Sequence, residues 1–207
     1  DMGHDVFRLG LHHKEETKEQ EKIRKELEKI RKALDVIDSS VITENLWGER
    51  WAKLCQNCMG NPVVAMSNLG TAELAGDEVC RKLQINLARE AAEIGEKLGL
   101  DFGKFGGASK DKWLQSVDKD IYLELDTMIK KRSNGPNRRP SMGQDIHRGR
   151  KTEILHMSGH VLAEARALKI DLPYTKKTME TIIQIDSGII QPSLDNVYTI
   201  INSLETV

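Results

Sequence analysis

The sequence predicts an all-α fold, and three observations support this prediction. Apolar residues recur at intervals of three and four over most of the chain, which is the spacing of one face of an α-helix. Clusters of Gly, Pro and Asn interrupt this spacing and mark turns between helices, as over residues 133–140. No Gly-x-Gly-x-x-Gly sequence follows a strand pattern, and strands and helices do not alternate as a parallel sheet requires.

The first part of the chain combines short extended segments with a charged helix. Residues 6–11 fit a short strand, and residues 36–42 fit a second one. Residues 14–34 fit an amphipathic helix with an apolar stripe formed by Ile23, Leu27, Ile30 and Leu34. Because the stripe is too short for a coiled coil, we expect this helix to pack on its own domain.

The remaining sequence is expected to form helices joined by short loops. One helix begins at Thr43-Glu44-Asn45 and should end near Asn61, because Pro62 disfavours the helical conformation of the residue before it. Ser141 and Thr175 fit the capping positions of later helices. The pattern indicates these later helices over residues 72–98, 113–129, 141–168, 175–185 and 193–204. We expect residues 1–12 to be a residual N-terminal segment or linker and residues 13–207 to form one helical domain.

Composition excludes several classes of function. The 207 residues include 31 Lys and Arg against 32 Asp and Glu, and this balance argues against a nucleic-acid partner. No apolar run approaches the roughly 20 residues that a membrane span needs, so no membrane partner is expected. The first five residues lack the pattern of a signal peptide, and three cysteines without a disulfide framework fit a reducing compartment. The cytoplasm is therefore the expected location.

One stretch contains side chains suited to catalysis or ligand binding: Trp51-Ala52-Lys53-Leu54-Cys55-Gln56-Asn57-Cys58-Met59-Gly60-Asn61-Pro62. Lys53, Asn57 and Asn61 are four residues apart, so one helix can present all three to one cleft. An ammonium group can neutralise and protonate an oxygen that gains charge, and amides can bind a carboxylate or hydroxyl without adding competing charge. From the spacing alone, a solvated helix face is the better explanation.

The second stretch runs from Ser141 to Ile154, with the sequence Ser-Met-Gly-Gln-Asp-Ile-His-Arg-Gly-Arg-Lys-Thr-Glu-Ile. On a continuous helix, Asp145, Gly149 and Glu153 would follow one another on one face. Glycine costs about 1 kcal/mol relative to alanine inside a helix. A glycine between two acids therefore suggests that something approaches the backbone closely.

These two stretches resemble the C-terminal signature of the ketopantoate reductase family. In that family, Ser-Met-x-Gln-Asp-x-x-x-x-Arg-x-Thr-Glu-Ile follows an earlier Trp-x-Lys-Leu block with Asn and Asn-Pro at the spacing seen here. The resemblance covers residues 36–172. It implies a multi-helix C-terminal domain of a 6-phosphogluconate-dehydrogenase-like type, lacking the Rossmann domain. It also implies NADP as cofactor and a small 2-keto acid as substrate. In such enzymes the cofactor is bound mainly by an N-terminal Rossmann domain, which this sequence lacks.

The resemblance also assigns roles to individual residues. Lys53 is implied as the general acid, and Glu153 as its catalytic acidic partner at the substrate hydroxyl. Asn57, Asn61 and Ser141 are implied as substrate-binding residues. Asp145 and Arg150 match the signature too, and we interpret them as supporting or structural residues. For Glu153 a solvated helix acid, and for Ser141 a plain helix cap, remain alternatives.

The sequence departs from the family signature at three positions. Leu155 replaces an Asp, Ser158 replaces an Asn, and Thr71 stands where an Asn often contacts substrate. These changes suggest a related keto acid rather than ketopantoate itself. Without a nucleotide-binding domain, the chain alone should have no reductase activity.

Several alternatives remain open at this point. A non-catalytic helical module for dimerisation or binding, derived from the same family, fits the altered residues, and a homodimer is possible in either case. A helical dehydrogenase domain for 3-hydroxy acids or opines lacks the second signature. Cys55 and Cys58 form a Cys-x-x-Cys, and His156 and His160 have a zinc-compatible spacing. We interpret the cysteines as buried core residues and expect no metal site.

Overall fold

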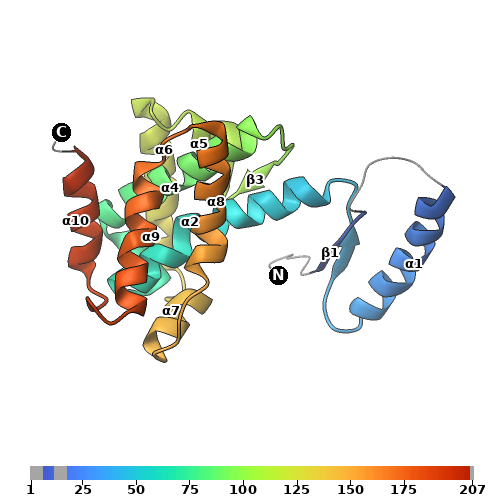
Figure 1. Cartoon of the computed structure of the whole chain (residues 1–207), viewed down its shortest axis with the longest axis horizontal. Coiled ribbons are helices and arrows are strands. Elements are labelled where there is room, and N and C mark those ends of the chain that lie inside the picture. Colours follow the sequence, from blue (N-terminus) through green and yellow to red (C-terminus); the bar gives the residue numbers. More distant parts are fainter. Residues whose placement is uncertain (1–6, 12–17, 206–207) are drawn as a thin grey trace.

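The computed structural model describes residues 7–11 and 18–205, and it confirms the all-α class (Figure 1). The helices are α1 (Lys18–Leu34), α2 (Leu46–Ser67), α3 (Thr71–Gly76), α4 (Glu78–Lys97), α5 (Lys110–Leu114), α6 (Lys119–Lys130), the 3₁₀ helix η1 (Lys131–Asn134), α7 (Ser141–His147), α8 (Ile154–Leu168), α9 (Pro173–Asp186) and α10 (Leu194–Glu205). The strands are β1 (Phe7–Leu9), β2 (Ser40–Ile42), β3 (Lys104–Phe105) and β4 (Ala108–Ser109).

The helical body, residues 46–205, is organised around α2 and α4. These two helices pack along one another, and the Trp51 indole Nε1 on α2 donates to the Ala91 carbonyl on α4 at 3.1 Å. Further helices surround this pair, with α7, α8, α9 and α10 against α2 (Figure 1). The core includes Leu83 and Trp113, both fully buried. One continuous core therefore fixes the position of α2, which carries the candidate site residues.

The predicted end of α2 at Asn61 is wrong. The helix continues through Pro62 to Ser67 and ends at Asn68, whose backbone is left-handed with φ 60°. A proline inside a helix removes one hydrogen bond. Here Pro62 and the four residues after it are buried, and the hydrophobic contacts of this turn offset that loss. Asn61 consequently lies within a helix rather than at its end.

The predicted helix over residues 141–168 is also wrong in its middle. α7 ends at His147, and α8 begins only at Ile154. Gly149 lies between them with φ +65°, a left-handed conformation that glycine adopts without strain. The amides of Gly149 and Arg150 donate to carbonyls of the last turn of α7, as at a common helix C-terminus. Gly149 thus terminates a helix, and Asp145 and Glu153 do not share a helical face.

Other predicted helices are divided or shifted at their ends. The helix predicted over residues 72–98 is interrupted at Asp77, whose side chain caps α4 by accepting from the Cys80 amide. The one predicted over residues 113–129 is split into α5 and α6. Thr175 is not a cap, because α9 already begins at Pro173. The last predicted helix, over residues 193–204, matches α10 within a residue at each end.

The first part of the chain forms a separate N-terminal unit, residues 7–11 and 18–42 in the described part. β1 and β2 pair in parallel, with Phe7 opposite Ser40, and α1 connects them beside the helical body (Figure 1). The expectation that no strand–helix–strand unit exists is therefore wrong. Its strands have three residues each, too few for a recognisable alternation.

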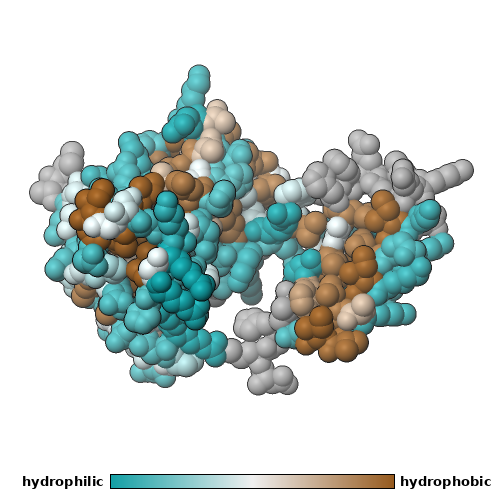
Figure 2. Space-filling model, turned by 60° about the horizontal axis from the view of Figure 1, so that its bottom comes forward, coloured by the Kyte–Doolittle hydropathy of each residue, from teal (hydrophilic) through white to brown (hydrophobic). Residues whose placement is uncertain are grey.

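The packing of α1 differs from the expectation that it packs on the helical domain. Its main contacts are with β1 and β2, and its apolar residues Ile23 and Ile30 remain 42% and 48% exposed. Apolar side chains gather on this unit in Figure 2. The expected helix start at residue 14 and the domain boundary after residue 12 lie outside the described residues. Among the described helices, none combines the length and apolarity that a membrane crossing requires.

Candidate active site

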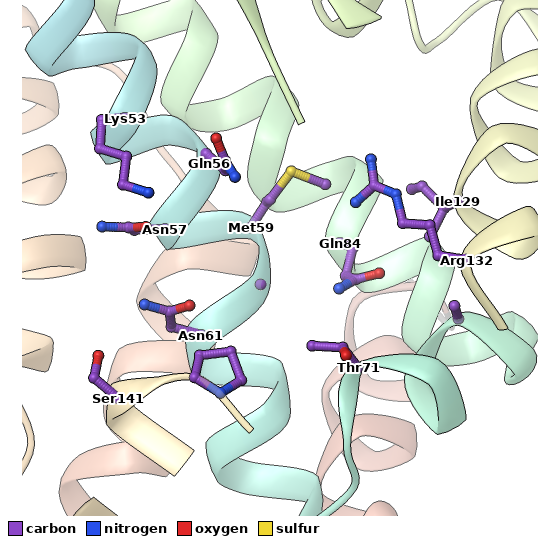
Figure 3. A pocket seen from close by; sticks show the side chains of 13 residues that line it. Lys53, Gln56, Asn57, Met59, Asn61, Thr71, Gln84, Ile129, Arg132 and Ser141 are labelled. Carbon is purple, nitrogen blue, oxygen red and sulfur yellow. The ribbon is translucent and has the colours of Figure 1, made fainter. Parts of the chain in front are cut away.

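The middle of α2 presents the predicted row of polar side chains to a cavity of about 470 Å³. Lys53, Asn57 and Asn61 all line this cavity, and Figure 3 shows them one above another along one side of α2. Their spacing of four residues produces this row because an α-helix turns once in 3.6 residues. The continuation of α2 through Pro62 keeps Asn61 in register with the other two.

Ser141 is brought to the same cavity by the close packing of α7 on α2. Gly143 faces Val64, and a Cβ at this glycine would lie only 2.7 Å from the Val64 Cγ1 atom. The guanidinium of Arg139 donates from Nη1 to the Asn68 side chain at 2.8 Å, which fixes the segment just before α7. Ser141 is the first residue of α7 and not its cap, because the helix starts after Pro140. Its hydroxyl is therefore available for other contacts.

Glu153 contacts Ser141 rather than Lys53. The Ser141 hydroxyl donates to Glu153 Oε1 at 3.3 Å, and Glu153 itself does not line the cavity. Lys53 forms no ion pair with any described side chain. The implied contact between Lys53 and Glu153 is thus not made in this structure. Glu153 reaches the cavity through Ser141, whose orientation it helps to fix.

Thr71, a departure from the signature, lines the cavity and anchors the loop before α7. Its amide donates to the Arg138 carbonyl at 2.8 Å, and its hydroxyl accepts from the Arg138 amide at 3.0 Å. The same hydroxyl donates to the Pro136 carbonyl at 3.4 Å. Thr71 therefore holds the segment that leads to Ser141, and this anchoring explains in structural terms why a threonine occupies this position.

Asp145 and Arg150 lie at the end of α7 and not in the cavity lining. The Arg150 amide donates to the Asp145 carbonyl at 2.8 Å, a backbone contact across the Gly149 turn. The next segment is held by Thr152, whose hydroxyl donates to Asp186 Oδ2 on α9 at 2.8 Å. These residues shape the α7–α8 connection, which positions Glu153.

Apart from Thr71, the opposite wall of the cavity was not foreseen in the sequence. It consists of residues from α3, α4, α6 and η1, and we call it the distal wall: Thr71, Ala75, Gln84, Ile129 and Arg132. Gln84 is 8% exposed, and its Oε1 atom has no hydrogen-bond partner in the described part of the chain. The only available signal was its position four residues from both Cys80 and Ala88 on a buried helix face, where a polar residue stands out.

The charge in the cavity is positive. Lys53 and Arg132 are among its lining residues, whereas no Asp or Glu is found in the described lining. The Arg132 guanidinium donates to the Gly106 carbonyl, and burial lowers the pKa of this arginine. The polar groups that complete the wall are neutral amides and hydroxyls. Such a cavity favours anions, because two cations and several hydrogen-bond donors face it without a counter-charge.

The family described as ketopantoate reductase PanE/ApbA C terminal matches residues 45–186. The chain belongs to the ketopantoate reductase family. A 2-dehydropantoate 2-reductase of Pyrococcus horikoshii is 22% identical over 171 residues, which are 83% of this chain and 49% of that protein. The chain therefore spans about half the length of this curated relative.

Solved structures share the fold of this family member. A dimeric ketopantoate reductase of Staphylococcus aureus matches with a TM-score of 0.59 and 17% identity, over 88% of this chain and 55% of that one. A D-mandelate dehydrogenase in a ternary structure with NADH and anilino(oxo)acetate matches with a TM-score of 0.61 and 17% identity, over 79% of this chain and 50% of that one.

The remaining departures from the family signature lie outside the cavity lining. Leu155 and Ser158 are both on α8, where Leu155 is 59% exposed and Ser158 is buried. Ser158 acts on the Cys58 thiol, whose pKa it lowers against the opposing effect of burial. Of the three departures, Thr71 alone touches the cavity directly.

The cysteines behave as core residues in this family member. Cys55, Cys58 and Cys80 are free and buried. Burial raises the pKa of all three thiols, and that of Cys58 reaches about 12. A thiol with such a pKa is a poor nucleophile and a poor redox group. The interpretation of Cys55 and Cys58 as core residues agrees with this burial. His156 and His160 are exposed on α8, and no group of three metal-binding side chains occurs in the described part of the chain.

Proposed function

We propose that this chain is the substrate-binding and catalytic half of an NADP-dependent reductase that converts small 2-keto acids to 2-hydroxy acids. The observation that carries the proposal is the convergence of Lys53, Asn57, Asn61 and Ser141 on one cavity without an acidic lining residue among those described. Family membership supports the reaction class. The positive cavity suits a substrate that carries a carboxylate.

The proposed chemistry assigns a distinct task to each side chain. Reduction of a 2-keto group leaves negative charge on the carbonyl oxygen, which the Lys53 ammonium neutralises and protonates. Asn57 and Asn61 donate hydrogen bonds to the substrate carboxylate and hydroxyl, and Ser141 contributes a further one. Glu153 acts through Ser141, because its carboxylate accepts from that hydroxyl. Bound NADPH supplies the hydride in this scheme, and a preceding Rossmann domain holds it.

The proposal includes the organisation of the protein. We place the start of the helical domain near Thr43 rather than at residue 13, because α1 packs mainly on β1 and β2. The N-terminal unit then belongs with the nucleotide-binding region. We also propose that the protein forms a homodimer, and the dimeric relative from Staphylococcus aureus supports this part of the proposal. Its proposed location is the cytoplasm.

The test is NADPH oxidation with ketopantoate and related 2-keto acids by this chain joined to its dinucleotide-binding domain. We expect Lys53→Ala to lower kcat by about 100-fold or more, because general acid catalysis contributes on that scale. Lys97→Ala is the matched control: Lys97 is exposed at the end of α4 and does not line the cavity, so activity should be unchanged.

Two outcomes would contradict the proposal. Equal activity in the Lys53→Ala and Lys97→Ala proteins would remove Lys53 from the chemistry. Absence of both NADPH binding and turnover would favour a helical dimerisation or binding module instead. The 207-residue chain by itself should oxidise no NADPH, which is measured in the same assay.

A further inference from the structure

The cavity has two chemically different ends, and the proposed reaction uses only one of them. Lys53, Asn57 and Asn61 lie on one side of α2 together with Ser141, whereas the distal wall lies on the other side (Figure 3). A volume of about 470 Å³ falls within the range of pockets that hold drug-sized ligands, about 300–1,000 Å³. A 2-keto acid with a short side chain leaves much of this space unused.

Gln84 indicates that a polar ligand group enters the distal end. This side chain is more than nine-tenths buried, lines the cavity, and has an amide oxygen without a hydrogen-bond partner among the described residues. A buried polar group without a partner is destabilising, so such groups are rare in folded proteins. A ligand relieves this cost. Because the amide can turn by a half-rotation about its last bond, it can present its N–H₂ group or its oxygen to that ligand.

Arg132 determines the charge of that ligand group. Its guanidinium contacts the Gly106 carbonyl, but no described carboxylate lies within ion-pair distance of it. Arginine binds carboxylates through paired hydrogen bonds more readily than it binds neutral groups. Arg132 and Gln84 come from η1 and α4 and face the same side of the cavity (Figure 3). A guanidinium and an amide side chain on the same side of a cavity suit the hydrogen-bonding needs of a carboxylate.

Gly60 leaves the passage between the two ends open. It lies on the cavity-lining face of α2, and a Cβ at this position would have no atom within 4 Å. Glycine weakens the middle of a helix, and close packing does not require it here. A position that is costly for the helix and faces empty space is explained by the need for room. The room connects Lys53 and Asn57 with the distal wall.

We propose that the cavity selects 2-keto acids whose side chain ends in a second carboxylate, bound by Arg132 and Gln84 after passing Gly60. The inference rests on the proposed function, because the keto acid end is placed at Lys53, Asn57 and Asn61. It makes Arg132 and Gln84 specificity-determining residues, outside the chemical step.

The test is isothermal titration calorimetry of the 207-residue chain with three ligands: 2-oxoglutarate, its side-chain amide 2-oxoglutaramate, and 2-oxobutyrate. We expect 2-oxoglutarate to bind about tenfold more tightly than the other two, since hydrogen bonds to charged groups are the strongest of those available. Arg132→Gln should remove this preference, because it should weaken 2-oxoglutarate binding much more than 2-oxobutyrate binding. Arg138→Gln is the matched control, because the exposed Arg138 does not line the cavity.

Three further variants separate specificity from folding and from the effect of charge. Gln84→Leu removes the unpartnered amide, so it should weaken 2-oxoglutarate binding without lowering the Tm. Gly60→Ala should raise the Tm, since alanine favours the helix, and yet weaken 2-oxoglutarate more than 2-oxobutyrate. Arg132→Lys keeps the charge and should retain part of the preference.

The outcomes distinguish the inference from the function on which it rests. Equal affinity for 2-oxoglutarate and 2-oxobutyrate overturns the distal carboxylate site and leaves the keto acid function standing. Tighter binding of the amide than of the carboxylate overturns the site as well. If none of the three keto acids binds, the proposed function fails and the inference fails with it.

Discussion

The N-terminal unit and the helical body are built from similar amphipathic helices, but they treat their apolar residues differently. In α4, Leu83 is fully buried against the core. In α1, Ile23 and Ile30 occupy an equally regular apolar stripe and are 42% and 48% exposed. The hydrophobic period therefore specifies that a helix forms. Whether its apolar face is buried depends on the elements that pack against it.

The two regions also use the same type of ion pair in different environments. Arg81 binds Asp126 through two nitrogens in the helical body, with side-chain exposures of 5% and 17%. Arg24 of the N-terminal unit binds Glu44, in the connection to α2, through two nitrogens as well, but their side chains are 45% and 72% exposed. The geometry of a pair thus says little about its contribution to stability, which depends on burial.

The largest effect should come from breaking the buried pair. Arg81→Met leaves Asp126 without its partner and removes donors to the Ala75 and Gly76 carbonyls, so we expect a loss of about 3–5 kcal/mol in unfolding free energy. Arg24→Met should lose less than about 1 kcal/mol. Urea denaturation of both variants measures the difference. Similar losses in the two variants would show that the regions are not distinct in this respect.

A smaller but clear contrast is expected for apolar truncations. Leu83→Ala creates a cavity in the core and should cost about 2–5 kcal/mol. Ile30→Ala removes a half-exposed side chain, and its effect should stay within about 0.5 kcal/mol. The same urea titrations measure both values. A loss of several kcal/mol from Ile30→Ala would mean that α1 is covered in solution.

The smallest effects concern pH, and the two regions should respond with opposite signs. Burial raises the pKa of Glu90 in α4, although it accepts from the Tyr174 and Thr175 amides. Its protonation favours the folded state, so its stabilising contribution is present at low pH and is lost as pH rises through its folded pKa. In the N-terminal unit, hydrogen bonds from Ser40 lower the pKa of Asp35. That contribution is present at neutral pH and is lost as pH falls through the folded pKa.

Hydrogen exchange of α1 and α4 amides separates these two contributions when it is followed from pH 7 to below 3.8, the ordinary pKa of an aspartate such as Asp35. Glu90→Gln should remove the pH-dependent loss in α4, and Asp35→Asn should remove the acid-induced loss in α1. If both regions weakened only toward acid in the unmodified chain, the assigned role of Glu90 would be wrong.

The helices were largely predictable from the sequence because their apolar faces are buried at a regular period, as in α8 and α10. Their interruptions were less visible. Asp77 caps a new helix where the apolar period continues without a break, and Gly149 ends α7 inside a motif whose residues favour a helix. At Pro62 the prediction placed a helix end where the structure has none. The burial of Pro62 and its neighbours in the core outweighs the local preference of a proline against a helical conformation of the preceding residue.

The family resemblance, and not the helical spacing by itself, singled out Lys53, Asn57, Asn61 and Ser141, which all line the cavity. Lys53, Asn57 and Asn61 follow a helical repeat within one segment. Gln84 and Arg132 are 48 residues apart in the sequence and come together through the packing of α4 and η1, which no local pattern records. The contact between Ser141 and Glu153 likewise depends on the turn at Gly149.

The carboxylate of Glu90 has a consequence for the order of folding. It receives the first amides of α9 from a position 85 residues earlier in the chain. Closing so long a segment is entropically costly, and such contacts form after local helices have already appeared. The first turn of α9 contains no capping side chain of its own. The hydrogen bonds of this turn are therefore complete only after α4 has formed. Through them, the last third of the chain is connected to one of the first helices of the helical body.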